Sequence, residues 1–127
     1  MIVFPYSEYL PDLFGNAVLT TAEIADEKPE LAKRVREALH KALVYTVAHP
    51  DEAATLLHEK QPETAVAVAA AEIKLMTPAV TARGQDQIGN IGRSRMSAAV
   101  DSLREAGLLG PSLKPEDVVD FDLMPAE

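Results

Sequence analysis

The chain has 127 residues, the length of one domain or of part of one, and 47% of them are apolar, which argues against wholesale disorder. Its formal net charge is −8, and a chain this acidic repels phosphate, so nucleic acid and anionic lipid are not expected as partners. Cysteine is absent, which excludes disulfides, thiolate metal ligands and cysteine nucleophiles together.

The first 21 residues combine two short apolar runs with an irregular aromatic connection. Strands are predicted at Ile2–Phe4 and Ala17–Thr21, and the prolines between them favour irregular backbone. Two short strands do not form a stable sheet alone, so they need partners from elsewhere. The N-terminus lacks the basic leader of a signal peptide, and no apolar run approaches the length of a membrane span.

From Thr21 onward the hydrophobic pattern is helical. Thr21 is a good cap for the first helix, and three later helices each begin with a proline, whose missing N–H costs nothing at that position. The predicted helices cover residues 22–27, 29–48, 50–60, 62–76 and 93–106. The chain therefore divides into a crossover and return strand, residues 1–21, and a helical part, residues 22–127.

The longest predicted helix, residues 29–48, has an apolar face and a charged side. Its solvent-facing side carries the favourable i,i+4 pairs Glu30–Arg34 and Glu37–Lys41. The residues that share the apolar face are Leu31, Val35, Leu39, Ala42 and Thr46.

No set of residues typical of catalysis or metal binding is found. His40, His49 and His58 are spaced by nine residues, so neighbours would point to opposite sides of a helix. The serines stand in none of the usual nucleophile motifs. The sequence therefore predicts no enzyme activity, no cofactor and no metal site.

Tyr6, Tyr9 and Asn16 are the candidate ligand-binding residues. They bring aromatic rings and a polar amide together in the irregular segment near the N-terminus. Rings of this kind can stack on a heterocycle while an amide bonds its polar edge. The same residues could instead anchor the segment to a core, and both interpretations stay open at this stage.

Four stretches, taken in order, resemble one family. PYSEYLPDLFGNAVLTT at 5–21 resembles a crossover that ends in a turn and a strand, and residues 27–57 resemble two successive proline-started helices. IGNIGRSRMSAAVDSLREAGLL at 88–109 resembles a late helix, and LKPEDVVDFDLMP at 113–125 resembles a closing tail. Together they are similar to the solute-binding proteins of ABC importers for thiamine pyrimidine precursors, and to their nitrate, sulfonate and riboflavin relatives.

The resemblance implies an α/β, two-lobed periplasmic-binding-protein fold of type II, of which this predominantly helical chain with two short strands would be the C-terminal part. The implied function is binding of a small nutrient, a thiamine pyrimidine precursor or related heterocycle, and its delivery to an ABC permease. The intact family member would be extracytoplasmic. Two alternatives stay open: part of a thiamine-pyrimidine biosynthesis enzyme of the same family, and a helical interaction domain.

The chain is also expected to self-associate. The strand at Ala17–Thr21 and the helix faces led by Leu31, Leu39, Val66 and Ile73 would lack neighbours in an isolated chain. Soluble monomers avoid large exposed apolar patches, so a two-fold homo-oligomer is predicted.

Overall fold

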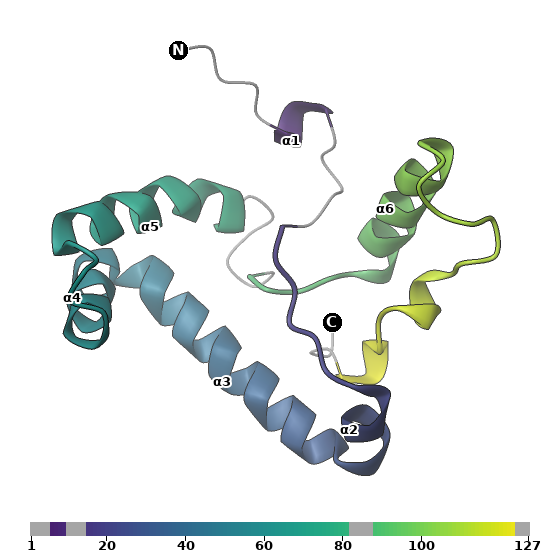
Figure 1. The fold of residues 1–127 in the computed structure, drawn as a ribbon, viewed down its shortest axis with the longest axis horizontal. Coiled ribbons are helices and arrows are strands. Elements are labelled where there is room, and N and C mark those ends of the chain that lie inside the picture. Colours follow the sequence, from purple (N-terminus) through teal and green to yellow (C-terminus); the bar gives the residue numbers. More distant parts are fainter. Residues whose placement is uncertain (1–5, 10–14, 82–87, 124–127) are drawn as a thin grey trace. The chain divides into compact units, whose positions relative to one another are not determined.

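The structure, a computed structural model, describes residues 6–9, 15–81 and 88–123 (Figure 1). This part of the chain is mostly helical, and none of its helices is long and apolar enough to cross a bilayer. The chain falls into two compact units, Met1–Ala32 with Ile91–Glu127 and Lys33–Asn90. The elements in order are α1 (Tyr6–Tyr9), α2 (Ala22–Glu27), α3 (Pro29–Ala48), α4 (Pro50–Lys60), α5 (Val66–Thr81), α6 (Arg93–Glu105), and the 3-10 turns η2 (Pro115–Asp117) and η3 (Phe121–Leu123).

The predicted bounds of α2, α3 and α4 are confirmed. The Thr21 hydroxyl accepts a hydrogen bond of 3.2 Å from the amide of Ile24, which satisfies one of the unpaired donors at the start of α2. Pro50 stands at the first position of α4, and the preceding His49 makes no side-chain capping bond. These starts follow from local chemistry, and for this reason the sequence is a good guide to them.

The predicted strand at Ala17–Thr21 is wrong. Residues 16–21 have no regular secondary structure, and they are exposed, Val18 and Leu19 included. A strand is stable only when a neighbour accepts and donates its backbone hydrogen bonds, and the described ranges contain no strand to pair with it. The other predicted strand, Ile2–Phe4, lies outside the described residues. An α/β description therefore has no support in the described residues, whereas the helical character is confirmed.

α4 and α5 form a hairpin that holds the core of the second unit. Ala54 of α4 is fully buried, and Ala69 and Ala70 of α5 are 2% and 7% exposed; Val66 and Ile73 pack against this cluster. Alanines at the contact let the two helices approach closely. Across the hairpin, the Lys74 ammonium lies 2.7 Å from the Asp51 carboxylate, an exposed ion pair of small energetic value.

α5 begins later and ends later than predicted. Pro62 lies in a turn, and the helix starts at Val66; just before this start, the Thr64 carbonyl accepts a hydrogen bond of 2.9 Å from His58. The amide of Val68 bonds to the Ala65 carbonyl instead, at 3.0 Å. At the other end α5 continues through Pro78 to Thr81, although a proline removes one backbone donor and strains a helix interior.

α3 shows an inverted pattern of burial. The predicted apolar face is exposed at Leu31, Val35 and Leu39, whereas the opposite side is half-buried. In the second unit, the segment at residues 88–90 lies against the half-buried side of α3. Ile88 of this segment is buried. A Cβ placed on Gly89 would lie 3.8 Å from the His40 ring and 3.9 Å from Leu43. The chain therefore covers one side of α3 and leaves its apolar side open.

Candidate functional site

The candidate ligand-binding residues lie on exposed segments of the first unit. Tyr6 and Tyr9 are the end residues of α1, and Asn16 follows in the irregular chain before α2. Tyr9 and Asn16 are both exposed, while the side chain of Tyr6 lies outside the described residues. An exposed ring and an exposed amide are available to a ligand, and the ligand-binding role of the three residues stays a prediction.

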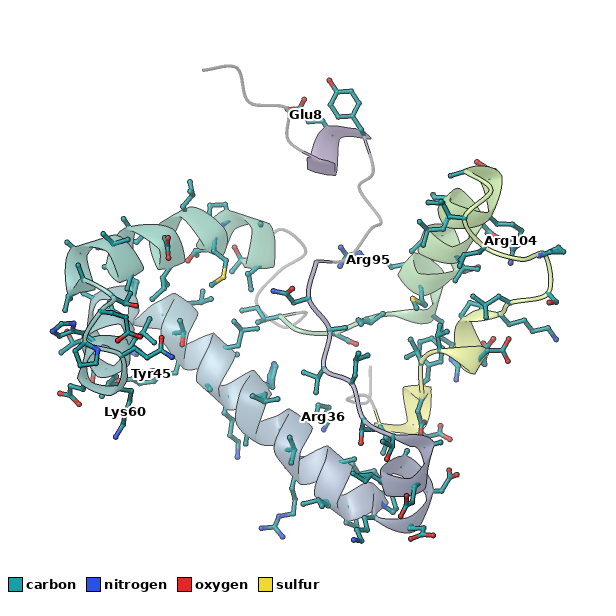
Figure 2. The ribbon with its side chains drawn as sticks, in the orientation of Figure 1. Glu8, Arg36, Tyr45, Lys60, Arg95 and Arg104 are labelled. Atoms are coloured by element: carbon teal, nitrogen blue, oxygen red, sulfur yellow. The ribbon has the colours of Figure 1, made fainter. Side chains whose placement is uncertain are left out.

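A second polar cluster stands where α3 meets α4. The rings of Tyr45 and His49 lie 4.7 Å apart between centroids and are tilted by 36°. The Tyr45 hydroxyl donates a hydrogen bond to the Glu52 carboxylate; this bond, partial burial and the negative charge of Glu52 raise the pKa of Tyr45 above its ordinary value of 10.0. Figure 2 shows Tyr45 at this junction.

Sequence reasoning missed the Tyr45–Glu52 contact. Glu52 stands in the first turn of α4, and His49 directly precedes Pro50. The two contacting residues are seven apart, a spacing of about two helical turns, but Pro50 breaks the helix between them. The cluster lies where α3 ends and α4 begins, with the ring of Tyr45 beside that of His49 and its hydroxyl interacting with Glu52.

The three histidines have separate environments. His58 closes the α4–α5 hairpin: since a carbonyl can only accept, its Nδ1 carries the proton and donates to Thr64. His40 is half-buried beside Gly89, and His49 is exposed against Tyr45. Among the described residues no three histidine, aspartate or glutamate side chains gather as metal ligands. The expectation of a chain without metal or cofactor stays a prediction.

The end of α6 is fixed by a backbone motif. The amide of Gly107 bonds to the Arg104 carbonyl and that of Leu108 to the Leu103 carbonyl, each at 2.9 Å. Gly107 has a φ of +74°, the left-handed conformation in which a glycine commonly ends a helix. This Schellman motif turns the chain back along α6.

The returning chain is held to α6 by two arginines. Arg93 lies 3.0 Å from the Glu116 carboxylate and 4.2 Å from the centre of the Phe121 ring. Arg104 donates to the Leu113 carbonyl at 2.8 Å, and Figure 2 shows its side chain beside the returning segment. These positively charged groups are therefore engaged in holding the C-terminal segment, a structural use that leaves them a poor basis for an anion site.

Comparison with known proteins finds similarity to a family model over part of the chain. Searches of curated proteins and of solved structures found no match. A family model described as "NMT1/THI5 like" matches residues 1–53, which include Tyr6, Tyr9, Asn16, α2, α3 and the first turn of α4. The sequence resemblance is thus confirmed at family level for this segment, and the importer subtype stays a prediction. Residues 1–53 of the chain are similar to a family of solute-binding and thiamine-precursor proteins.

Proposed function

We propose that this chain is the C-terminal segment of an ABC-transporter solute-binding protein for a small nutrient, a thiamine pyrimidine precursor or a related heterocycle. The observation that carries the proposal is the family match over residues 1–53. In this proposal the chain performs no catalysis. The intact protein is extracytoplasmic, and it delivers its ligand to an ABC permease.

The N-terminal segment is the part of the chain that we assign to the ligand. Tyr9 presents an exposed ring for stacking on a flat heterocycle, and Asn16 presents an exposed amide that can donate to or accept from its polar edge. Solute-binding clefts enclose most of the ligand surface, so the proposal places further walls of the cleft outside residues 1–127. Residues 1–127 alone should accordingly bind such ligands weakly or not at all.

The decisive experiment is uptake of a labelled hydroxymethyl aminopyrimidine in the source organism. A strain that lacks the gene should lose high-affinity uptake, and the complete gene should restore it. Uptake that continues unchanged in the deletion strain would contradict the transport proposal. A strain that keeps uptake but requires added thiamine pyrimidine would point to the biosynthetic alternative.

Variants at Tyr9 test the assignment of the site. In the complete gene product, Tyr9→Ala should weaken ligand binding by about 1–3 kcal/mol, the range for loss of one stacked ring. Tyr9→Phe keeps the ring and should bind nearly as the wild type does. Titration calorimetry measures both. Equal affinities for Tyr9→Ala and wild type would return Tyr9 to a structural role.

A further inference from the structure

α3 carries an apolar stripe that the described chain leaves open. The stripe runs from Leu31 to Tyr45, and its residues are spaced by four, three, four and three positions, the a/d spacing of a coiled-coil seam. Leu31 and Val35 keep exposed fractions of 47% and 46%, and the neighbouring Leu39 keeps 47%. The α3 stripe consists of Leu31, Val35, Ala38, Ala42 and Tyr45, all of them exposed.

The α3 stripe is complementary in size to a reversed copy of itself. When two such helices pack antiparallel, an a position of one faces a d position of the other. One register places Leu31 opposite Ala42 of a second copy, and Val35 opposite Ala38 of that copy. Each large side chain then meets a small one, and the two-fold axis repeats both contacts.

A charged ridge lies along one edge of the α3 stripe. Along the helix it reads Glu30, Arg34, Glu37 and Lys41, so the signs alternate. In this register, reversal of the second helix sets Arg34 between Glu37 and Lys41 of the second copy, and Lys41 between its Glu30 and Arg34, so each basic side chain has one acidic and one basic neighbour. Parallel packing would set the ridge against the other edge of the stripe, at residues 32, 39 and 46, which carries no charge.

The contact that Glu37 makes within the chain is weak. Glu37 pairs with the adjacent Arg36 at 3.4 Å, and both are solvent-accessible, so this contact contributes little stability. Figure 2 shows Arg36 and Tyr45 on opposite sides of α3, so Arg36 lies away from the stripe. Arg34 and Lys41 are exposed at the edge of the stripe.

We infer that α3 forms the interface of a two-fold dimer of this chain, in which two copies of the helix pack antiparallel through the α3 stripe. The inference rests on the exposed stripe and on its pairing of large with small residues. It is independent of the ligand and of the transport role.

The first experiment is sedimentation equilibrium on the wild type and on two matched variants. Val35→Asp places a carboxylate in the α3 stripe, and Leu75→Asp places one at an 82%-exposed leucine of α5. At about 100 μM, wild type and Leu75→Asp should be dimeric, whereas Val35→Asp should dissociate at least tenfold more readily. Because Val35 is half exposed in the single chain, its variant should keep the wild-type circular dichroism.

The second experiment tests the direction of packing by disulfide cross-linking. The chain has no cysteine, so each introduced thiol is unique. A mixture of Leu31→Cys and Ala42→Cys chains should form the mixed disulfide. Leu31→Cys alone should not cross-link, because the two thiols would stand about 11 residues, or about 16 Å, apart along the axis, beyond the reach of a disulfide.

Three results would overturn the inference. They are a monomeric wild type at about 100 μM, a dimer that Val35→Asp does not weaken, and a Leu31→Cys homodimer linked through its own thiols. The first would leave the α3 stripe to a different partner. The second would move the interface elsewhere, and the third would show a parallel pair.

Discussion

The tight alanine contact between α4 and α5 predicts a large difference between two identical substitutions. Ala69 is 2% exposed in the cluster with Ala54, whereas Ala71, two residues along the same helix, is exposed. Leucine adds three carbon atoms to either site. At Ala69 there is no room for them, and overpacking of a tight contact costs about 1–3 kcal/mol. At Ala71 the added atoms extend into water, and surface changes of this kind stay within about 0.5 kcal/mol.

Urea denaturation followed by circular dichroism measures the difference. With a cost of about 2 kcal/mol and a denaturant slope of about 2 kcal/mol per molar urea, the midpoint of Ala69→Leu should fall by about 1 M. Ala71→Leu, which has the same helix propensity and the same added volume, should unfold at nearly the wild-type midpoint. Coincident midpoints for Ala69→Leu and wild type would show that α4 and α5 do not pack through this cluster.

Two further outcomes are expected. Gly107→Ala should lose about 1–2 kcal/mol of stability through the left-handed φ alone, because nothing lies within 4 Å of the added methyl; an unchanged melting temperature would contradict the Schellman motif. In a spectrophotometric pH titration, the tyrosine ionisation that Tyr45→Phe removes should occur at lower pH in Glu52→Gln than in the wild type. Because the pKa of Tyr45 is higher in the folded than in the unfolded chain, the Tyr45–Glu52 contact stabilises the fold below pH 10 and loses that contribution as the pH rises through the folded pKa. Identical titrations of wild type and Glu52→Gln would refute the Tyr45–Glu52 contact.

Helix starts were predictable because their causes are local. Thr21 and Pro50 determine the beginnings of α2 and α4 through one side-chain bond and one fixed φ angle, both of which can be inferred from neighbouring residues. The start of α5 could not be inferred in this way. Just before that start, His58 of the previous helix binds the Thr64 carbonyl after the chain has turned, a tertiary contact that local patterns do not record.

The orientation of α3 could not be predicted because periodicity identifies a face but not what covers it. Leu31 and Leu39 mark the apolar face correctly, but Ile88 and Gly89, more than forty residues away, cover the other side at His40. For the candidate site the situation is similar. Aromatic and amide residues in an irregular segment could be identified, but their partners depend on tertiary contacts that local patterns do not record.

The buried residues and the family match occupy different parts of the chain. All six described residues with buried apolar side chains lie after residue 53, namely Ala54, Ala69, Ala70, Ile88, Ala99 and Val100. The matched segment, residues 1–53, instead holds exposed apolar residues such as Leu19, Leu31 and Val35. The part of the chain that resembles the family is thus the part with the least core of its own, and its apolar surface needs a partner from outside the segment.

This difference predicts how hydrogen exchange responds to concentration. Amide protons of α4 and α5 are protected by packing within one chain, so their exchange should not change with protein concentration. Those of α3 between Leu31 and Tyr45 should exchange more slowly as the concentration rises from about 1 to 100 μM, because mass action forms the dimer that covers the α3 stripe. The same experiment on Val35→Asp should show no such slowing. Equal concentration dependence in α3 and α5 would mean that association involves some other surface, and a complete lack of dependence would mean that α3 has no partner in a second copy.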